Sequence, residues 1–407
     1  MKPSIKRSID IAFTVCLMAL LVGFLIKGGA PVLEALAAAA EQTRANFAER
    51  GLSGEALSAE HEILVSVRDG LIADYDERFP GRVHFVNLNG ALRRLLGQRL
   101  MNERVRLDNG YLLAPVPEAD TAAPAESLSE LHAYCRERDI AFLFMLAPSK
   151  AAPDGEALPA GVQDYAAANA ERFLSLLRAR GIPYMDVAAE MEAAGLPHYE
   201  QFFRTDHHWT PRAAFWSFAR LADRLEESEG WETDALYTDA ENYTSIWYED
   251  WFLGSDGRRT GRYFAGTDDF ELILPRFETR LSFSVPEDGI ERSGSYAEAY
   301  IYWPDIEERN YFNLSPYSAY TGGDFPLALQ RNLAGDTGRR LLLVRDSFAC
   351  AIQPYLTFSF DEVDVVDLRY AEDFSLYAYV EETQPDMLLF LYGAETLANP
   401  PAFAFDG

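Results

Sequence analysis

Apolar residues gather in short runs that alternate with segments of helical spacing along much of the chain. Runs of strand length, rich in apolar residues, occupy 140–146, 183–187, 341–344, 363–366 and 387–392. Helical spacing of apolar residues marks 126–137, 161–180, 211–227, 348–357 and 374–383. An alternation of buried strands and amphipathic helices predicts an α/β fold, in which a parallel sheet is flanked by helices.

This alternation stops between about residues 235 and 335, where aromatic residues and glycines are frequent. We interpret the stretch as a large insertion in an α/β domain that spans residues 125–407. Its aromatic side chains, such as Trp247 and Trp251, have two interpretations. They form the core of the insertion itself, or their faces stack on the rings of a bound sugar.

Residues 31–124 precede the α/β domain. Helical spacing of Ala, Leu and Glu from 31 to 80 predicts stalk helices, which Pro80 and Gly81 would end. From 83 to 114 the pattern is closer to that of strands, around turn signals at Asn89 and Gly90 and again at 108–110. We therefore expect a stalk and a strand-rich lead-in, followed by a linker at 115–124.

The N-terminus has the pattern of a membrane signal. Residues 11–26 carry no charge, and Lys2, Lys6 and Arg7 precede them. A basic segment before an apolar one keeps the N-terminus in the cytoplasm and directs the following chain across the membrane. We expect residues 1–30 to form a signal anchor, a single transmembrane helix in the cell membrane with the bulk of the chain extracytoplasmic. A cleaved signal peptide is the alternative.

Charge and cysteine content exclude two classes of function. The 407 residues include 36 Lys and Arg against 64 Asp and Glu, a formal net charge of −28. Attraction to phosphate backbones cannot drive binding by so acidic a chain, so no nucleic-acid partner is expected. Cysteine occurs only as Cys16, Cys135 and Cys350, which cannot build a disulfide framework or a cysteine-rich zinc site.

The densest group of polar residues is Thr-Asp-His-His-Trp-Thr at 205–210, directly before a predicted helix. In one interpretation Asp206 or Thr210 only caps that helix. In a second, Asp206, His207 and His208 bind a metal, although no further ligand lies at a signature spacing. In a third, Asp206 and His208 form a catalytic pair, because residues i and i+2 of an extended segment lie on the same side.

A serine follows the predicted strand 341–344, in the sequence Leu-Leu-Leu-Val-Arg-Asp-Ser-Phe. A buried parallel strand places the Ser347 hydroxyl at the carboxyl edge of the sheet, where open α/β folds bind ligands. The N–H groups at the start of the next helix suit an oxyanion, and that of Ser347 is the first candidate. Alternatively, Asp346 or Ser347 only caps the helix.

These motifs resemble a known family. Asp-Ser-Phe at 346–348 is similar to the Gly-Asp-Ser-Leu block of SGNH hydrolases. Asp-His-His-Trp at 206–209 resembles the motif of alginate O-acetylation proteins (AlgJ and AlgX) and of the DHHW family, and further landmarks follow in the family's order between 83 and 395. The resemblance implies an SGNH-hydrolase-like (flavodoxin-like) fold, with Ser347 as nucleophile, His208 as general base and Asp206 as its orienting carboxylate.

Residues near these motifs are candidates for contact with substrate. Arg345 stands where the SGNH block has glycine, and its charge would attract the carboxylate of an acidic glycan. Lys150 follows the strand 140–146 at the edge where ligands bind; otherwise it is a solvated surface charge. The tentative substrate-binding residues are His207, Trp209, Lys150, Arg345, Gly254, Ser255 and Gly323. We expect Cys350 to be a small buried residue rather than a second nucleophile.

The expected function is extracytoplasmic acyl transfer by a Ser-His-Asp site, with no metal and no other cofactor. The resemblance implies O-acetylation of a bacterial cell-surface or secreted polysaccharide. It also implies a partner, a polytopic membrane O-acyltransferase that supplies acetyl. The alternatives are an acetylesterase, a non-catalytic glycan-binding scaffold of the same fold, and a metal-dependent hydrolase that uses Asp206, His207 and His208.

Overall fold

The computed structural model describes residues 81–152, 158–371 and 373–406. The predicted signal anchor and the predicted stalk helices, residues 1–80, lie outside the described residues. The chain divides into two compact units, Met1–Phe85 and Val86–Gly407, and the sheet and site described below belong to the second. Within the described stretches, no helix combines the length and the apolar character needed to cross a bilayer.

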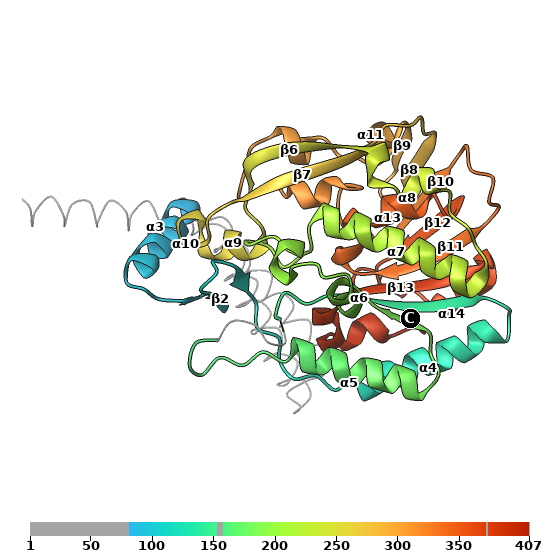
Figure 1. The fold of residues 1–407 in the computed structure, drawn as a ribbon, viewed down its shortest axis with the longest axis horizontal. Coiled ribbons are helices and arrows are strands. Elements are labelled where there is room, and N and C mark those ends of the chain that lie inside the picture. The colour runs from blue at the N-terminus through green and yellow to red at the C-terminus, as the bar shows by residue number, and fades with distance from the viewer. Residues whose placement is uncertain (1–80, 153–157, 372, 407) are drawn as a thin grey trace, which may run out of the picture. The chain divides into compact units, whose positions relative to one another are not determined.

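A mixed sheet of eight strands forms the centre of the second unit (Figure 1). Its strand order is β5-β4-β13-β11-β12-β10-β8-β9. The strands from β5 to β12 run parallel, and β10, β8 and β9 continue the sheet in antiparallel pairs. The strands are β4 (Ala141–Ala147), β5 (Tyr184–Asp186), β8 (Leu281–Val285), β9 (Ile290–Gly294), β10 (Leu327–Asn332), β11 (Arg340–Arg345), β12 (Glu362–Val366) and β13 (Met387–Gly393).

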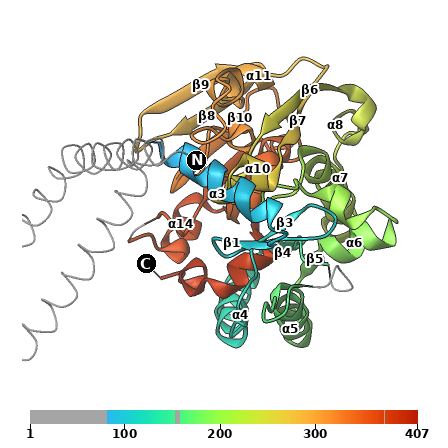
Figure 2. The ribbon, with the colours of Figure 1, turned by 90° about the vertical axis from the view of Figure 1, so that its left-hand side faces the viewer.

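Both faces of the parallel strands are buried, which explains their nearly continuous apolar sequences. In β11, Leu341 and Leu343 belong to one hydrophobic cluster, whereas Leu342 and Val344 belong to another on the opposite face. The first face is covered by α6 (Val187–Ala193), α7 (Pro211–Glu229) and α13 (Gln353–Leu356). The second is covered by α4 (Ala122–Arg136), α5 (Ala166–Ala179) and α14 (Leu376–Thr383), and Figure 2 shows α4 and α5 next to each other.

The insertion extends the main sheet, which corrects the prediction of a purely parallel one. β10 pairs with β12, so β10, β8 and β9 are added to the parallel strands. A separate two-stranded sheet is formed by β6 (Tyr243–Phe252) and β7 (Asp268–Pro275). The short helices of this region are α8 (Ala235–Thr238), η2 (Ala240–Asn242), α9 (Ser255–Thr260), α10 (Arg262–Ala265), α11 (Tyr296–Ala299), α12 (Pro304–Glu307) and η3 (Pro316–Ala319).

The aromatic residues of the insertion divide into two groups. Phe252, Phe270 and Tyr300 are buried in the main hydrophobic cluster, as an aromatic core predicts. Trp247 and Tyr263, in contrast, are 55% and 56% exposed. The exposed rings are placed to meet a ligand from solvent.

The lead-in differs from the strand-like pattern expected for residues 83–114. Its first part is a helix, α3 (Arg82–Leu95), and the short antiparallel strands come later, as β1 (Leu100–Met101), β2 (Arg104–Arg106) and β3 (Leu112–Leu113). Gly90, which suggested a turn, lies inside the helix. A Cβ atom there would lie 2.5 Å from the carbonyl oxygen of Thr260, so this glycine permits close packing rather than a turn.

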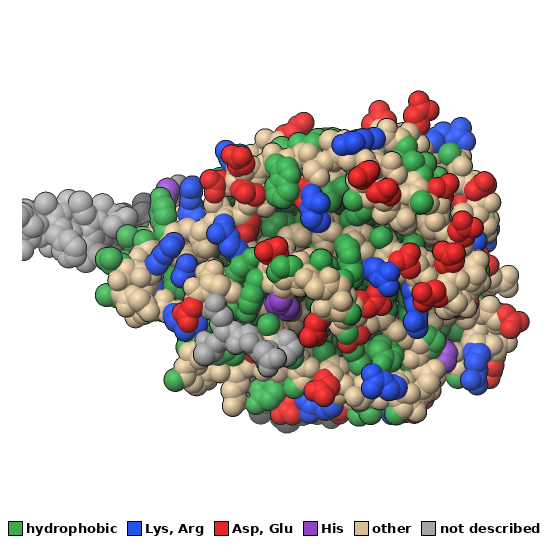
Figure 3. Space-filling view, viewed as in Figure 1, with side chains coloured by type: hydrophobic (Ala, Val, Ile, Leu, Met, Phe, Trp, Pro, Cys, Tyr) green, Lys and Arg blue, Asp and Glu red, His purple; other side chains and the backbone are tan. Residues whose placement is uncertain are grey.

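The surface is charged on the side shown in Figure 3, where acidic side chains are spread among basic ones. Because the chain carries a formal charge of −28, this surface repels polyanions at long range.

Candidate active site

Ser347 lies where β11 ends, at the carboxyl edge of the sheet, and begins the 3-10 helix η4 (Ser347–Ala351). The buried side chain of Asp346 fixes this turn. Its Oδ1 accepts a hydrogen bond from the N–H of Phe348 at 2.9 Å, and its Oδ2 accepts from the N–H of Gly393 at 2.7 Å and from Thr396 Oγ1 at 2.5 Å. Asp346 thus caps η4 and ties the serine turn to the end of β13, which leaves the Ser347 hydroxyl for other contacts.

The Ser347 hydroxyl, His208 and Asp206 form one chain of hydrogen bonds. Ser347 Oγ lies 2.8 Å from His208 Nε2, and His208 Nδ1 lies 2.5 Å from Asp206 Oδ1. The same carboxylate oxygen accepts the backbone N–H of His208 at 3.0 Å. Because Nδ1 faces a carboxylate, the imidazole carries its proton there and offers Nε2 as an acceptor to the serine. The structure therefore brings together the three residues that the motifs singled out.

Asp206 is held from the insertion. Its Oδ2 accepts the N–H of Ser255 at 2.6 Å, and Gly254 packs against its side chain. Burial alone would raise the pKa of this carboxyl, but the imidazoles of His208 and His207 and these hydrogen bonds hold it well below its ordinary value. Asp206 is therefore ionised at neutral pH, and Gly254 and Ser255 position it.

Gly254 leaves no room for a larger residue. A Cβ atom at this position would lie 2.2 Å from Cβ of Asp206, so a Gly254→Ala protein must displace the carboxylate. A displacement of about 1 Å near a catalytic group costs about 100-fold in rate, and we expect that loss in kcat for hydrolysis of 4-nitrophenyl acetate. Gly289→Ala, in the exposed turn between β8 and β9, controls for glycine replacement in the insertion: a Cβ there meets no neighbour within 4 Å, and the cost is confined to the left-handed φ of 63°. Equal rates in the two variants would contradict this role of Gly254.

The His208 ring is enclosed by aromatic side chains. Tyr317 of η3 stacks on it, with ring centroids 4.2 Å apart and planes 14° apart, and Phe348 packs edge-on at 5.1 Å. Tyr317 and Trp209 both donate to the carbonyl oxygen of Phe348, each at 2.9 Å. This packing restricts the imidazole to the orientation in which it reaches Ser347. Trp209 itself is fully buried, so the structure places it in the core rather than at an open surface.

His207 sits beside the pair but makes a separate contact. Its Nδ1 lies 3.0 Å from Ser255 Oγ, and desolvation by burial, with the adjacent His208, lowers the pKa of its imidazole. Asp206, His207 and His208 are also the one group in the described ranges whose ligand atoms, within 4.8 Å of one another, are close enough for a metal. Both ring nitrogens of His208 already face Asp206 and Ser347, so this arrangement suits the triad better than a metal.

Lys150 is neither a solvated surface charge nor open to substrate, so both expectations for this residue are wrong. Its side chain is buried, its Nζ donates to the carbonyl oxygen of Leu112 at 2.8 Å, and its carbonyl oxygen meets His198 Nε2 at 3.1 Å. Desolvation by burial lowers the pKa of its ammonium group. Lys150 therefore joins the lead-in to the sheet behind the site.

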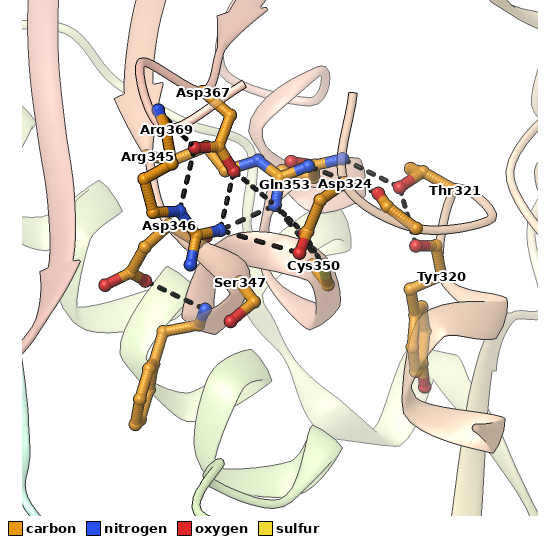
Figure 4. A network of polar contacts seen from close by, with 12 residues as sticks. Tyr320, Thr321, Asp324, Arg345, Asp346, Ser347, Cys350, Gln353, Asp367 and Arg369 are labelled. Carbon is orange, nitrogen blue, oxygen red and sulfur yellow. Dashed lines mark hydrogen bonds and ion pairs between the residues drawn. The ribbon is translucent and has the colours of Figure 1, made fainter. Parts of the chain in front are cut away.

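Arg345 is also buried, and its charge is paired inside the protein (Figure 4). Its guanidinium forms ion pairs with Asp324 and with Asp367, and Nη2 donates to the carbonyl oxygen of Gly323 at 3.2 Å. Burial opposes ionisation of Asp324, but the guanidinium of Arg345 lowers the pKa of that carboxyl to about 2. This corrects the expectation that Arg345 attracts an acidic glycan. Instead, it anchors the loop that contains Gly323 and Asp324 to the end of β11.

Cys350 belongs to the same network. Its Sγ lies 3.3 Å from Asp324 Oδ1 and 3.5 Å from Arg345 Nη1. Burial raises the pKa of this thiol, so it stays protonated. The prediction that Cys350 is a buried residue is confirmed.

Glu395 is an ionisable group at the same edge that the sequence did not single out. It lies in η5 (Ala394–Ala398), after β13, and its Oε2 is buried with no hydrogen-bond partner among the described residues. Burial raises the pKa of its carboxyl to about 8 from an ordinary 4.5. The group is therefore largely protonated in the folded protein at neutral pH.

Glu395→Gln tests this protonation state. A carboxyl whose pKa is higher in the folded than in the unfolded state contributes stability below the unfolded pKa and loses it as the pH rises through the folded pKa. Glutamine stays neutral, so we expect the variant to melt at least about 2 °C above the parent near pH 8, and the difference to shrink toward pH 5. Thermal unfolding followed by circular dichroism measures it. A difference that does not change with pH would show that Glu395 is ionised in the fold.

Several residues of the site were not predicted. Tyr317, which stacks on His208, has no sequence signal, because an isolated tyrosine in an aromatic stretch looks like any core residue. Asp324 and Asp367 lie among the further family landmarks between residues 83 and 395, and that resemblance was the available signal. Thr396, which holds Asp346, follows a strand end and has none.

Residues 107–245 match the family model described as the SGNH hydrolase-like domain of the acetyltransferase AlgX. The predicted resemblance is confirmed. The matched residues include the Asp206–His208 pair, whereas Ser347 lies beyond them.

Solved structures agree in fold. Bacillus cereus PatB1 is similar at a TM-score of 0.61 and 22% identity, over 74% of this chain and 99% of that one. A DHHW family protein from Eubacterium siraeum is similar at 0.53 and 19% identity, over 74% and 94%. At these identities the likeness establishes the fold alone. No curated protein matches the sequence.

Proposed function

We propose that this protein is an extracytoplasmic O-acetyltransferase that acts on a cell-surface or secreted polysaccharide. The observation that carries the proposal is the continuous hydrogen-bonded chain from Ser347 Oγ through His208 to Asp206. The AlgX-like domain and the fold of PatB1 support the reaction class, and a structure of PatB1 with a sulfonyl adduct has the same fold. The uncharged segment at 11–26 behind basic residues supports the extracytoplasmic location.

The reaction follows from these contacts. Ser347 Oγ attacks the carbonyl carbon of an acetyl ester while His208 Nε2 takes its proton, and Asp206 stabilises the resulting imidazolium. The N–H of Ser347, at the first turn of η4, is a donor for the oxyanion. Collapse of this intermediate expels the donor's alcohol, which receives the proton from His208. A sugar hydroxyl then attacks the acetyl-serine, gives its proton to His208, and leaves as the acetylated sugar with Ser347 restored.

The donor is a separate part of the proposal. A polytopic membrane O-acyltransferase would present acetyl on the outer side of the membrane, where the predicted anchor at 1–30 holds this chain. If water replaces the sugar in the second step, the same site is an acetylesterase.

A competition assay tests the proposal. Full-length protein in mild detergent is given 4-nitrophenyl acetate as donor and a neutral hexasaccharide as acceptor, and acetylated sugar and free acetate are measured by mass spectrometry. We expect acetylated sugar with the parent and none with His208→Ala. Acetate without acetylated sugar would identify an esterase. If neither product forms and Ser347 carries no acyl adduct, the result would favour a non-catalytic glycan-binding scaffold.

A further inference from the structure

A pocket on the insertion lies outside the triad and has no part in the chemistry above. It has a volume of about 520 Å³ and lies between β6 and the segment that follows α12. Its walls comprise Trp247, Tyr248, Glu249, Trp251, Glu307 and Arg309. Aromatic faces with a few polar groups are the usual lining of a site for a small organic ligand.

The aromatic side of the pocket is fixed in place. Trp251 is buried, its Nε1 donates to the carbonyl oxygen of Ile306 at 2.8 Å, and the Arg309 guanidinium lies 5.5 Å from its ring centroid. Trp247 is 55% exposed on the same strand. An indole left open to solvent beside a rigid pocket offers an apolar face on which a flat ligand surface can stack.

The polar side of the pocket has hydrogen-bond acceptors to offer. Glu249 and Glu307 line the pocket and are exposed to solvent, so their carboxylates can accept hydrogen bonds from ligand hydroxyls. Arg309, the one cation of the lining, instead donates to the carbonyl oxygens of Glu249 at 2.6 Å and Asp250 at 3.3 Å. With two carboxylates against one guanidinium, the pocket favours a neutral ligand rich in hydroxyl groups over an anionic one.

Both walls of the pocket lead directly to the triad. Trp251 precedes Ser255, whose N–H holds Asp206, by four residues, a stretch that spans at most about 14 Å. The other wall continues from Arg309 to Tyr317, which stacks on His208. The pocket and the triad are therefore linked by two short segments of the insertion, residues 251–255 and 309–317.

We propose that this pocket binds a neutral segment of the polysaccharide acceptor, with a sugar ring stacked on Trp247 and its hydroxyls on Glu249 and Glu307. The inference rests on the proposed function and narrows it to polymers of neutral or N-acetylated sugars rather than of uronic acids. The burial of Arg345 removes the cation that would have suited a uronate, and the net charge of −28 repels a polyanion along its length.

Binding is measured without turnover, so that the pocket and the chemistry are tested separately. Full-length Ser347→Ala protein is titrated in mild detergent with cellohexaose, with chitohexaose and with hexagalacturonate, and dissociation constants are obtained by calorimetry. We expect at least one neutral hexamer to bind at least about tenfold more tightly than the uronate. Adding Trp247→Ala should weaken that binding at least about tenfold. Adding Tyr263→Ala, which removes an equally exposed aromatic ring outside the lining, should not.

Three outcomes would overturn the inference. They are failure of both neutral hexamers to bind, tighter binding of the uronate, and equal effects of Trp247→Ala and Tyr263→Ala. None of them bears on whether Ser347 is acylated, because the acyl adduct of the parent protein measures acylation independently.

Replacing both Glu249 and Glu307 with Gln tests the charge argument. Without the two carboxylates, the ratio between the dissociation constants of the uronate and of the neutral hexamer should decrease. An unchanged preference would contradict that argument.

Discussion

Ser347→Ala protein is expected to lose about 10⁴-fold to 10⁶-fold of its turnover of 4-nitrophenyl acetate. The loss is this large because the hydroxyl that lies 2.8 Å from His208 Nε2 is the proposed nucleophile itself, and the substitution removes it. His208→Ala should lose a similar amount, since removal of either partner disables the same proton transfer. Initial rates and the intact mass of the protein after brief exposure to the ester measure turnover and acylation together.

A second serine provides the control for this substitution. Ser293 lies exposed on β9, far along the chain from the site, and Ser293→Ala should keep both the rate and the acyl adduct. An adduct that maps to Ser347 in the parent and disappears in Ser347→Ala would identify the nucleophile. Turnover that survives in Ser347→Ala would mean that the chemistry takes place elsewhere in the protein.

Arg345→Met should destabilise the fold by about 3 to 5 kcal/mol, although Arg345 touches no substrate. The substitution removes the buried cation between Asp324 and Asp367 and leaves the buried carboxylate of Asp367 and the partly buried one of Asp324 with one partner fewer, which is the costly way to break such an ion pair. Arg369 still pairs with Asp367 at 2.6 Å and so limits the loss. We expect the melting temperature to fall by roughly 5 to 15 °C, measured by circular dichroism at neutral pH.

Arg340→Met is the matched control on the same strand. Arg340 begins β11, and its side chain is 53% exposed where it meets Glu362 at 3.4 Å. Exposed pairs of this kind contribute little, so the control should melt close to the parent. If both variants melted alike, the network of Figure 4 would not be a main source of stability around the serine turn.

The parallel part of the sheet and the triad were predictable for the same physical reason. Strands buried on both faces need nearly continuous apolar sequences, and a serine after such a strand must lie at the carboxyl edge. Asp206 and His208 are two residues apart, so their contact could be predicted from the local sequence alone. The order of the strands was not contained in this pattern, and the match of β10 to β12 depends on pairing between distant segments.

The partners of Arg345 could not be predicted, because a charge in a sequence looks the same whether it is solvated or paired. Asp324 and Asp367 lie 21 and 22 residues from it in opposite directions, and only the fold brings them together. Helix α3 was missed for a related reason. Its Gly90 is required by the backbone of Thr260, a neighbour in space that the local pattern does not contain.

Residues of the insertion position Asp206, and this matters for protein engineering and for the divergence of related proteins. Gly254 and Ser255 fix the carboxylate, and Tyr317, from the same insertion, fixes the imidazole. The insertion, which also contains the exposed Trp247, therefore cannot be exchanged without affecting the catalytic residues. Consider a chimera in which β6 and β7 are replaced by those of a relative. Its Asp206–His208 pair would stay in place only if residues 253–255 and 316–319 still fit the new strands. We therefore expect changes of polymer preference and changes of catalytic activity to be inherited together.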